Sequence, residues 1–184
     1  MKFWLEQSFR IFIIWALVGS TAAAQAQEAS SVSFFADHSF KVIEGRCADV
    51  AVSGSATKSG STFTAQNLTI QCSIPKMTTG NRNRDSNMWE MLGFPQVQQI
   101  TVLVPSASAK AGKAPVSFVV RMHGKEKSMT SDMNFEEQSG SVVVSGDFTV
   151  SLAEYDVTPP KLLMLKVGDA VLVRFRIAVP VQGK

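Results

Sequence analysis

The chain has 184 residues, of which 45% are hydrophobic and 18% are charged, and its formal net charge at pH 7 is +3. This length suits one domain with a core of its own. The basic residues are dispersed, whereas a nucleic-acid-binding surface needs a basic stripe with aromatic residues between the charges.

The N-terminus has the pattern of a cleavable export signal. Basic residues accompany a short apolar run over residues 11–18, and small residues then lead to Ala24-Gln25-Ala26. The run is too short to span a bilayer comfortably, so we predict a signal peptide over residues 1–26, cleaved after Ala26. An uncleaved membrane anchor is the alternative. The remaining domain, residues 27–184, is then expected in a bacterial periplasm or outside the cell.

The two cysteines lie in the predicted exported part, where disulfides persist. A hairpin turning at Ser59-Gly60 would place Cys47 directly opposite Cys72 on the adjacent strand, within disulfide reach. The same register puts two valines on the polar face, so it also needs a β-bulge near Ala48-Asp49. We predict a Cys47–Cys72 disulfide, and two buried free thiols are the alternative.

Residues 77–95 contain the single helical segment that we expect after the signal. Asp85 is the predicted N-cap, and Gly93 before Phe94-Pro95 ends the helix. The apolar residues between them follow at helical spacing: Met88, Trp89, Met91 and Leu92. One helix in a chain rich in strands indicates a sheet closed around an interior, with the helix covering part of it.

Most other segments alternate apolar and polar residues with a period of two, which predicts strands with one buried face. The clear strands are 68–74, 116–122, 129–135, 142–150 and 171–179, and the weaker ones are 32–36, 40–43, 50–56 and 98–105. Short polar turns join them, as in an antiparallel meander. About eight such strands can form a sandwich or a closed barrel, and closure removes exposed edges.

Residues 155–167 interrupt this alternation. Pro159-Pro160 cannot continue a strand ladder, and the apolar residues 162–165 are not separated by polar ones. We expect a loop packed against the barrel or its mouth. It is either a plain crossover or a lid over a cavity.

The order of several short motifs resembles the YceI-like family of exported proteins. The motifs are Gly45-Arg46, Thr79-Gly80, Arg84-Asp85, Phe94-Pro95 and the turn from Met122-His123-Gly124 to Lys127. The resemblance extends from about Val32 to Val179. It implies an elongated, lipocalin-like antiparallel barrel whose interior holds a lipid tail, typically a polyisoprenoid or quinone-like chain. Cys47 departs from the pattern, because the family usually has phenylalanine there.

Inward-facing apolar residues are the candidate ligand-lining positions. A long apolar tail binds through buried area, so its site needs apolar side chains, including adaptable methionines, and few polar groups. The candidates are Phe118, Val120, Met122, Met129, Met133, Val144, Phe148, Val173 and Phe175. In any β-barrel the same residues could instead form a packed core.

Residues typical of catalysis or metal binding are sparse. His38 and His123 have no cysteine or carboxylate at metal-ligand spacing, and no serine lies in a G-x-S-x-G elbow. Arg84-Asp85 either fixes a loop and caps the helix or binds a polar head group at the barrel mouth. We therefore expect no catalytic residue, metal or cofactor apart from a bound isoprenoid or quinone lipid.

These observations predict an all-β protein with one short helix, folded as an elongated lipocalin-like barrel. The predicted function is a non-catalytic periplasmic carrier for an apolar isoprenoid-type lipid. One alternative is an exported structural or stress-related protein with a filled barrel that acts through a protein partner, and another is a hydrolase of lipid-like substrates. Transient contact with a membrane surface and a homo-oligomer are compatible with the carrier, and nucleic acid is not an expected partner.

Overall fold

The structure is a computed structural model, and it describes residues 30–38, 41–138, 140–159, 161–162 and 165–182. The predicted signal peptide over residues 1–26 lies outside the described residues. The strands are β1 (Ser31–His38), β2 (Lys41–Cys47), β3 (Val50–Ser53), β4 (Ala56–Ser59), β5 (Thr62–Ser73), β6 (Met77–Thr78), β7 (Gln99–Lys110), β8 (Gly112–Met122), β9 (Lys125–Gln138), β10 (Ser141–Ser151), β11 (Lys161–Leu162) and β12 (Leu165–Gln182). The helices are η1 (Ile74–Lys76), α1 (Arg82–Met91) and η2 (Leu152–Tyr155).

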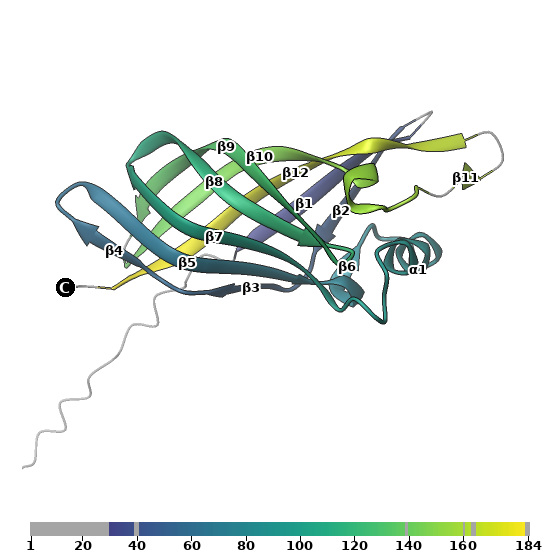
Figure 1. Cartoon of the computed structure of the whole chain (residues 1–184), viewed down its shortest axis with the longest axis horizontal. Coiled ribbons are helices and arrows are strands. Elements are labelled where there is room, and N and C mark those ends of the chain that lie inside the picture. Colours follow the sequence, from purple (N-terminus) through teal and green to yellow (C-terminus); the bar gives the residue numbers. More distant parts are fainter. Residues whose placement is uncertain (1–29, 39–40, 139, 160, 163–164, 183–184) are drawn as a thin grey trace, which may run out of the picture.

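Seven strands close into a barrel in the order β4-β5-β7-β8-β9-β10-β12, because β12 pairs with β10 on one edge and with β4 on the other (Figure 1). The predicted all-β barrel with one short helix is confirmed. One pairing corrects the expected antiparallel arrangement: β12 and β4 run parallel, with Val181 opposite Ala56. An up-and-down meander with an odd number of strands brings its first and last strands together in the same direction.

The remaining strands complete the wall at the end of the barrel that carries α1 (Figure 1). Strand β4 meets β12 only at residues 181–182, so most of that edge of the long β12 is free of β4. Strand β1 pairs with this edge, β2 pairs with β1, and β6 pairs with β2. No ladder in the described residues joins β2 to β5, and we call this gap in the wall the opening. On its β5 side, β3 pairs with β5.

The Cys47–Cys72 disulfide is present, with 6.0 Å between the two Cα atoms, but the predicted register was wrong. The hairpin turns at Gly60-Ser61, and Val50 is the residue opposite Cys72. Cys47 lies at the end of β2, which pairs with β1 and β6. The bond therefore joins β2 to β5, two strands that share no ladder in the described part of the chain. No bulge near residues 48–49 is needed, because the chain leaves β2 there and starts β3.

The helix is where the sequence predicts it, but Asp85 is not its N-cap. Asn81 caps α1: its backbone is extended, and its side-chain oxygen accepts a hydrogen bond from the Arg84 backbone N–H at 3.1 Å. Gly93 follows the last turn with φ +90°, as expected for a helix-ending glycine. No helix in the described residues is long and apolar enough to cross a membrane.

The segment after β10 packs its first part against the barrel. Tyr155 and Val157 are almost completely buried, and the short β11 pairs with β12. The Asp169 carboxylate holds η2 in place by accepting hydrogen bonds from the Ser151 hydroxyl and the Ala153 backbone N–H. Burial, with a smaller contribution from the charge of Glu154, raises the pKa of Tyr155 to about 12. Residues 160 and 163–164 of the predicted loop or lid lie outside the described residues.

Alternation fails to predict burial at one place on the outer face of the barrel. Val143 faces outward, since its neighbour Val142 belongs to the interior cluster, yet it is fully buried. Its partner across the ladder, Ala178, is also buried and donates its backbone N–H to the Ser30 hydroxyl at 3.2 Å. Ser30, the residue just before β1, therefore lies beside this patch.

Candidate ligand-binding cavity

The barrel interior contains two adjoining chambers. The wide chamber has a volume of about 410 Å³ and lies at the α1 end. The narrow chamber has a volume of about 100 Å³ and extends toward β4. Five residues line both: Val32, Ile70, Val102, Phe148 and Val173. The two chambers therefore lie along one axis of the barrel.

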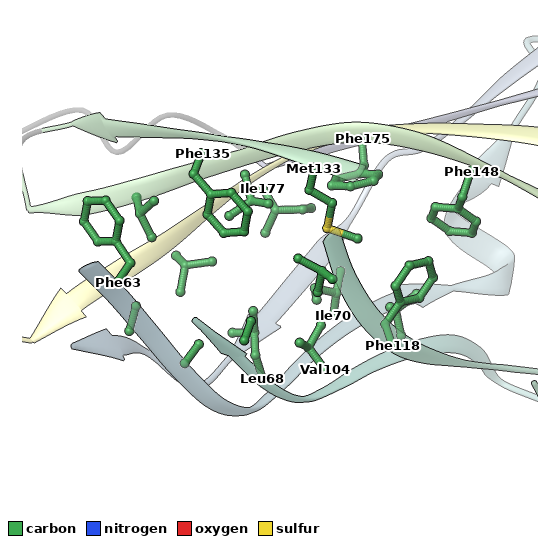
Figure 2. A pocket seen from close by; sticks show the side chains of 18 of the residues that line it. Phe63, Leu68, Ile70, Val104, Phe118, Met133, Phe135, Phe148, Phe175 and Ile177 are labelled. Atoms are coloured by element: carbon green, nitrogen blue, oxygen red, sulfur yellow. The ribbon is translucent and has the colours of Figure 1, made fainter. Parts of the chain in front are cut away.

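The narrow chamber is lined by apolar side chains throughout (Figure 2). Phe63 and Phe135 lie at one end and Phe118 and Phe148 at the other (Figure 2). Phe63 and Phe118 are only 3% and 1% exposed, so their rings are closely packed, and the free space among the side chains is only about 100 Å³. This half of the barrel is close to a packed core.

The wide chamber is lined by side chains from α1 and from strands on both sides of the opening, including β1, β2, β5, β7, β8, β10 and β12. Its lining is apolar except for Thr79, just before α1, and Arg84 and Asn87 on α1. Asn87 is exposed, so the chamber reaches the surface there. A largely apolar space with polar side chains only on and just before α1 matches an amphipathic molecule.

Arg84 and Asp85 have different roles: Arg84 lines the wide chamber, and Asp85 stabilises the fold around α1. The Arg84 guanidinium donates from Nε to the Thr79 hydroxyl at 2.8 Å and from Nη2 to the Thr79 carbonyl at 2.9 Å, which fixes its direction in the chamber wall. Asp85 is 6% exposed and accepts hydrogen bonds from the Thr79 backbone N–H and from the hydroxyls of Thr79 and Thr78. Asp85 thus attaches α1 to the strand that precedes it.

The surroundings of Asp85 lower the pKa of its carboxyl below the ordinary 3.8. Burial alone would raise this pKa, but the hydrogen bonds from Thr79 and Thr78 and the positive charge of Arg84 outweigh it. A depressed folded-state pKa contributes stability that is fully present above the unfolded-state pKa and is lost as the pH falls through the folded-state value.

Replacing Asp85 by Ala is therefore expected to lower the free energy of unfolding at neutral pH by about 1–3 kcal/mol, because three donors lose their buried acceptor. The loss relative to wild type should shrink as the pH falls from the unfolded-state pKa, about 4, through the lower folded-state pKa, where the folded wild-type carboxylate becomes protonated. Urea unfolding followed by circular dichroism at several pH values measures both effects. Glu90→Gln, at an exposed position of the same helix, is the matched control. Equal stability of Asp85→Ala and wild type at neutral pH would contradict this role.

The structure places eight of the nine predicted lining residues along the two chambers. Phe118, Met133, Val144 and Phe175 line the narrow chamber, Val120 and Met122 line the wide one, and Phe148 and Val173 line both. Met129 is not in either lining and packs, partly buried, against the core. Whether these side chains contact a ligand stays a prediction.

Sequence reasoning missed much of the wide chamber. Its lining includes Met88 and Met91 of α1, Leu92 at the C-cap of this helix, Phe34 of β1 and Ile100 of β7. The helical spacing of the apolar residues in α1 was visible in the sequence and indicates a face that packs on the barrel. Which strands this helix covers could not be predicted from the sequence, because that depends on where the sheet opens.

Gly45 of the predicted Gly45-Arg46 motif has a packing role in the wide chamber. It lies opposite Phe34 in the β1–β2 ladder. A Cβ atom on Gly45 would lie 2.1 Å from Cζ of the Phe34 ring. The missing side chain therefore lets the Phe34 ring lie over the backbone of β2.

The described residues contain no group of three or more His, Cys, Asp or Glu side chains that could hold a metal ion. His123 begins the two-residue turn between β8 and β9, where both His123 and Gly124 have positive φ. Its Nδ1 lies 3.0 Å from the Tyr155 carbonyl oxygen. His123 thus links this turn to η2.

A family model described as "YceI-like domain" matches residues 24–179 of the chain. No curated protein matches. The fold is similar to that of BcnA from Burkholderia cenocepacia, with a TM-score of 0.68 and 13% identity over 82% of this chain and 96% of that one. It is also similar to a polyisoprenoid binding domain from Saccharophagus degradans, with a TM-score of 0.65 and 15% identity over 83% of this chain and 94% of that one. The YCEI protein of Campylobacter jejuni gives a TM-score of 0.57 and 11% identity over 76% and 85% of the two chains.

Proposed function

The chain belongs to the YceI-like domain family, and from this premise we propose that it binds an isoprenoid-type lipid, such as a polyisoprenoid or a quinone with an isoprenoid tail, as a non-catalytic carrier in the periplasm. The observation that carries the proposal is the apolar interior, whose wide chamber of about 410 Å³ has polar side chains only on and just before α1. A volume of this size is typical of small-molecule sites. The name of the Saccharophagus degradans domain supports the same class of ligand.

The lipid tail lies along the wide chamber among the side chains of α1 and the strands. Its binding energy comes from buried apolar surface, at about 25 cal/mol per Å², less the cost of ordering a flexible chain. Each 100 Å² of tail surface would then contribute about 2.5 kcal/mol before that cost. The lining presents few hydrogen-bonding groups, so it selects for an apolar chain and not for a particular polar substituent.

The polar head of the lipid lies beside Thr79, Arg84 and Asn87. Arg84 is already held by two hydrogen bonds to Thr79, so little side-chain entropy is lost when it donates to a head-group oxygen. The lipid enters and leaves at this end, where Asn87 reaches the surface. Transient contact with a membrane surface is part of this proposal, because an isoprenoid has little solubility in water.

The test is to express the full chain in a bacterium, purify the exported protein without detergent, and extract it with organic solvent for mass spectrometry. We expect an isoprenoid or quinone mass in stoichiometric amount in the extract. The control is an extract of the same host fraction without the protein. An empty extract from folded protein, together with no uptake of added isoprenoid alcohol, would contradict the proposal and favour a filled barrel that acts through a protein partner.

A further inference from the structure

Phe148 stands at the boundary between the two chambers. Of the five residues that line both, Phe148 is the one aromatic, and the others are valines and an isoleucine. We propose that Phe148 sets the length of the apolar chain that the barrel accepts, by closing the narrow chamber to a tail that fills the wide one. This inference rests on the proposed lipid-binding function and adds a specificity-determining residue to it.

The Phe148 ring is held in this position by two other aromatic rings. Its centroid lies 4.9 Å from that of Phe118 on β8 and 6.1 Å from that of Phe175 on β12. The interplanar angles, 59° and 51°, give tilted contacts of the kind that stabilise aromatic pairs. The three rings come from β8, β10 and β12 and contact one another through Phe148, and we call this group of rings the partition.

Phe148 is the part of this partition that a tail in the wide chamber would meet. Phe118 and Phe175 line only the narrow chamber, and Phe118 is 1% exposed. Phe148 lines both chambers and is only half-buried although it faces the interior. The Phe148 ring is therefore packed against Phe118 and Phe175 and also borders the free space of the wide chamber.

The space behind the partition is long enough to change the ligand. Along β12, Val171 and Val173 line the wide chamber, and Val173 to Val179 line the narrow one. At about 3.3 Å per residue, the strand from Val173 to Val179 spans about 20 Å. With a strand tilt of about 40°, this corresponds to about 15 Å along the barrel axis. Removing the Phe148 ring would join the narrow chamber's volume of about 100 Å³, and the volume of the ring itself, to the wide chamber.

The experiment offers purified, delipidated protein an equimolar mixture of linear isoprenoid alcohols, from farnesol to decaprenol, and measures the retained lengths by mass spectrometry. Phe148→Ala is expected to raise the ratio of longer to shorter retained chains about tenfold, the scale on which small changes in apolar pockets discriminate. Phe148→Leu should shift it in the same direction by less. Phe148→Trp should shift it toward shorter chains.

Phe135→Ala is the matched control, because Phe135 lines only the narrow chamber at the end far from Phe148 (Figure 2). It removes the same ring but leaves the partition intact, so the retained lengths should equal those of wild type. Circular dichroism and thermal unfolding check the fold of each variant, and Phe148→Leu serves if Phe148→Ala does not fold.

Two negative results have different meanings. If the wild type retains isoprenoid alcohols but folded Phe148→Ala or Phe148→Leu keeps the same length distribution, the role of Phe148 is wrong and lipid binding stands. If the wild type retains no alcohol of any length, the proposed function itself fails. A shift of equal size in Phe135→Ala would also overturn the inference, since the length limit would then lie at the far end of the narrow chamber.

Discussion

A Cys47→Ser, Cys72→Ser double variant is expected to lose about 2–4 kcal/mol of unfolding free energy relative to the disulfide-bonded wild type. The two cysteines are 25 residues apart in sequence, so the bond removes considerable loop entropy from the unfolded chain. In the folded protein it joins β2 to β5, which have no ladder between them in the described residues. The bond is thus the direct covalent connection across this opening of the wall.

Urea unfolding of the double variant and of the wild type, with and without reductant, measures this loss. The reduced wild type should unfold at a urea concentration close to that of the double variant, since both lack the bond. Both cysteines line the wide chamber, so the double variant should also retain less lipid. An unchanged unfolding midpoint in the double variant would show that β6 and the core hold this opening without the bond.

Ile100→Trp is expected to weaken lipid retention by about tenfold or more. Ile100 lies on β7 and lines only the wide chamber, where a larger side chain takes volume that a tail would occupy. It is partly exposed, so the larger ring can enter the chamber without displacing a fully packed neighbour. Retention of added isoprenoid alcohol, measured after gel filtration, gives the effect.

Thr101→Trp is the matched control, because Thr101 is the next residue of β7 and its side chain points to the opposite face of the sheet. It should leave retention unchanged. If both variants retain as much lipid as wild type while folded, the wide chamber is not where the tail lies. Phe118→Trp would be a poorer test than Ile100→Trp, because Phe118 is fully buried and a larger ring there would strain the core.

Several local features followed correctly from the sequence. A side-chain period of two fixes which residues of a strand share a face, so the inward positions Phe118, Val144, Phe148, Val173 and Phe175 could be identified before any pairing was known. The end of α1 at Gly93 also followed from the sequence, since glycine adopts the positive φ found after a helix without a steric penalty.

Errors arose where a residue's role depends on a distant partner. Asp85 has the chemistry of an N-cap, but Thr78 and Thr79 on the preceding segment engage its carboxylate, and Asn81 caps the helix. The Cys47–Cys72 disulfide was predicted correctly, but the hairpin register that supported the prediction was wrong, because β3 and not β2 pairs with β5.

By itself, the sequence determined the strand faces, the position of α1 and the apolar character of the interior. These properties depend on spacing along the chain and on side-chain chemistry. The tertiary structure alone decided that β12 pairs in parallel with β4, that the wall opens between β2 and β5, and that Phe148 separates two chambers. These features arise from barrel closure and from side chains of different strands meeting across the interior, which no local pattern specifies.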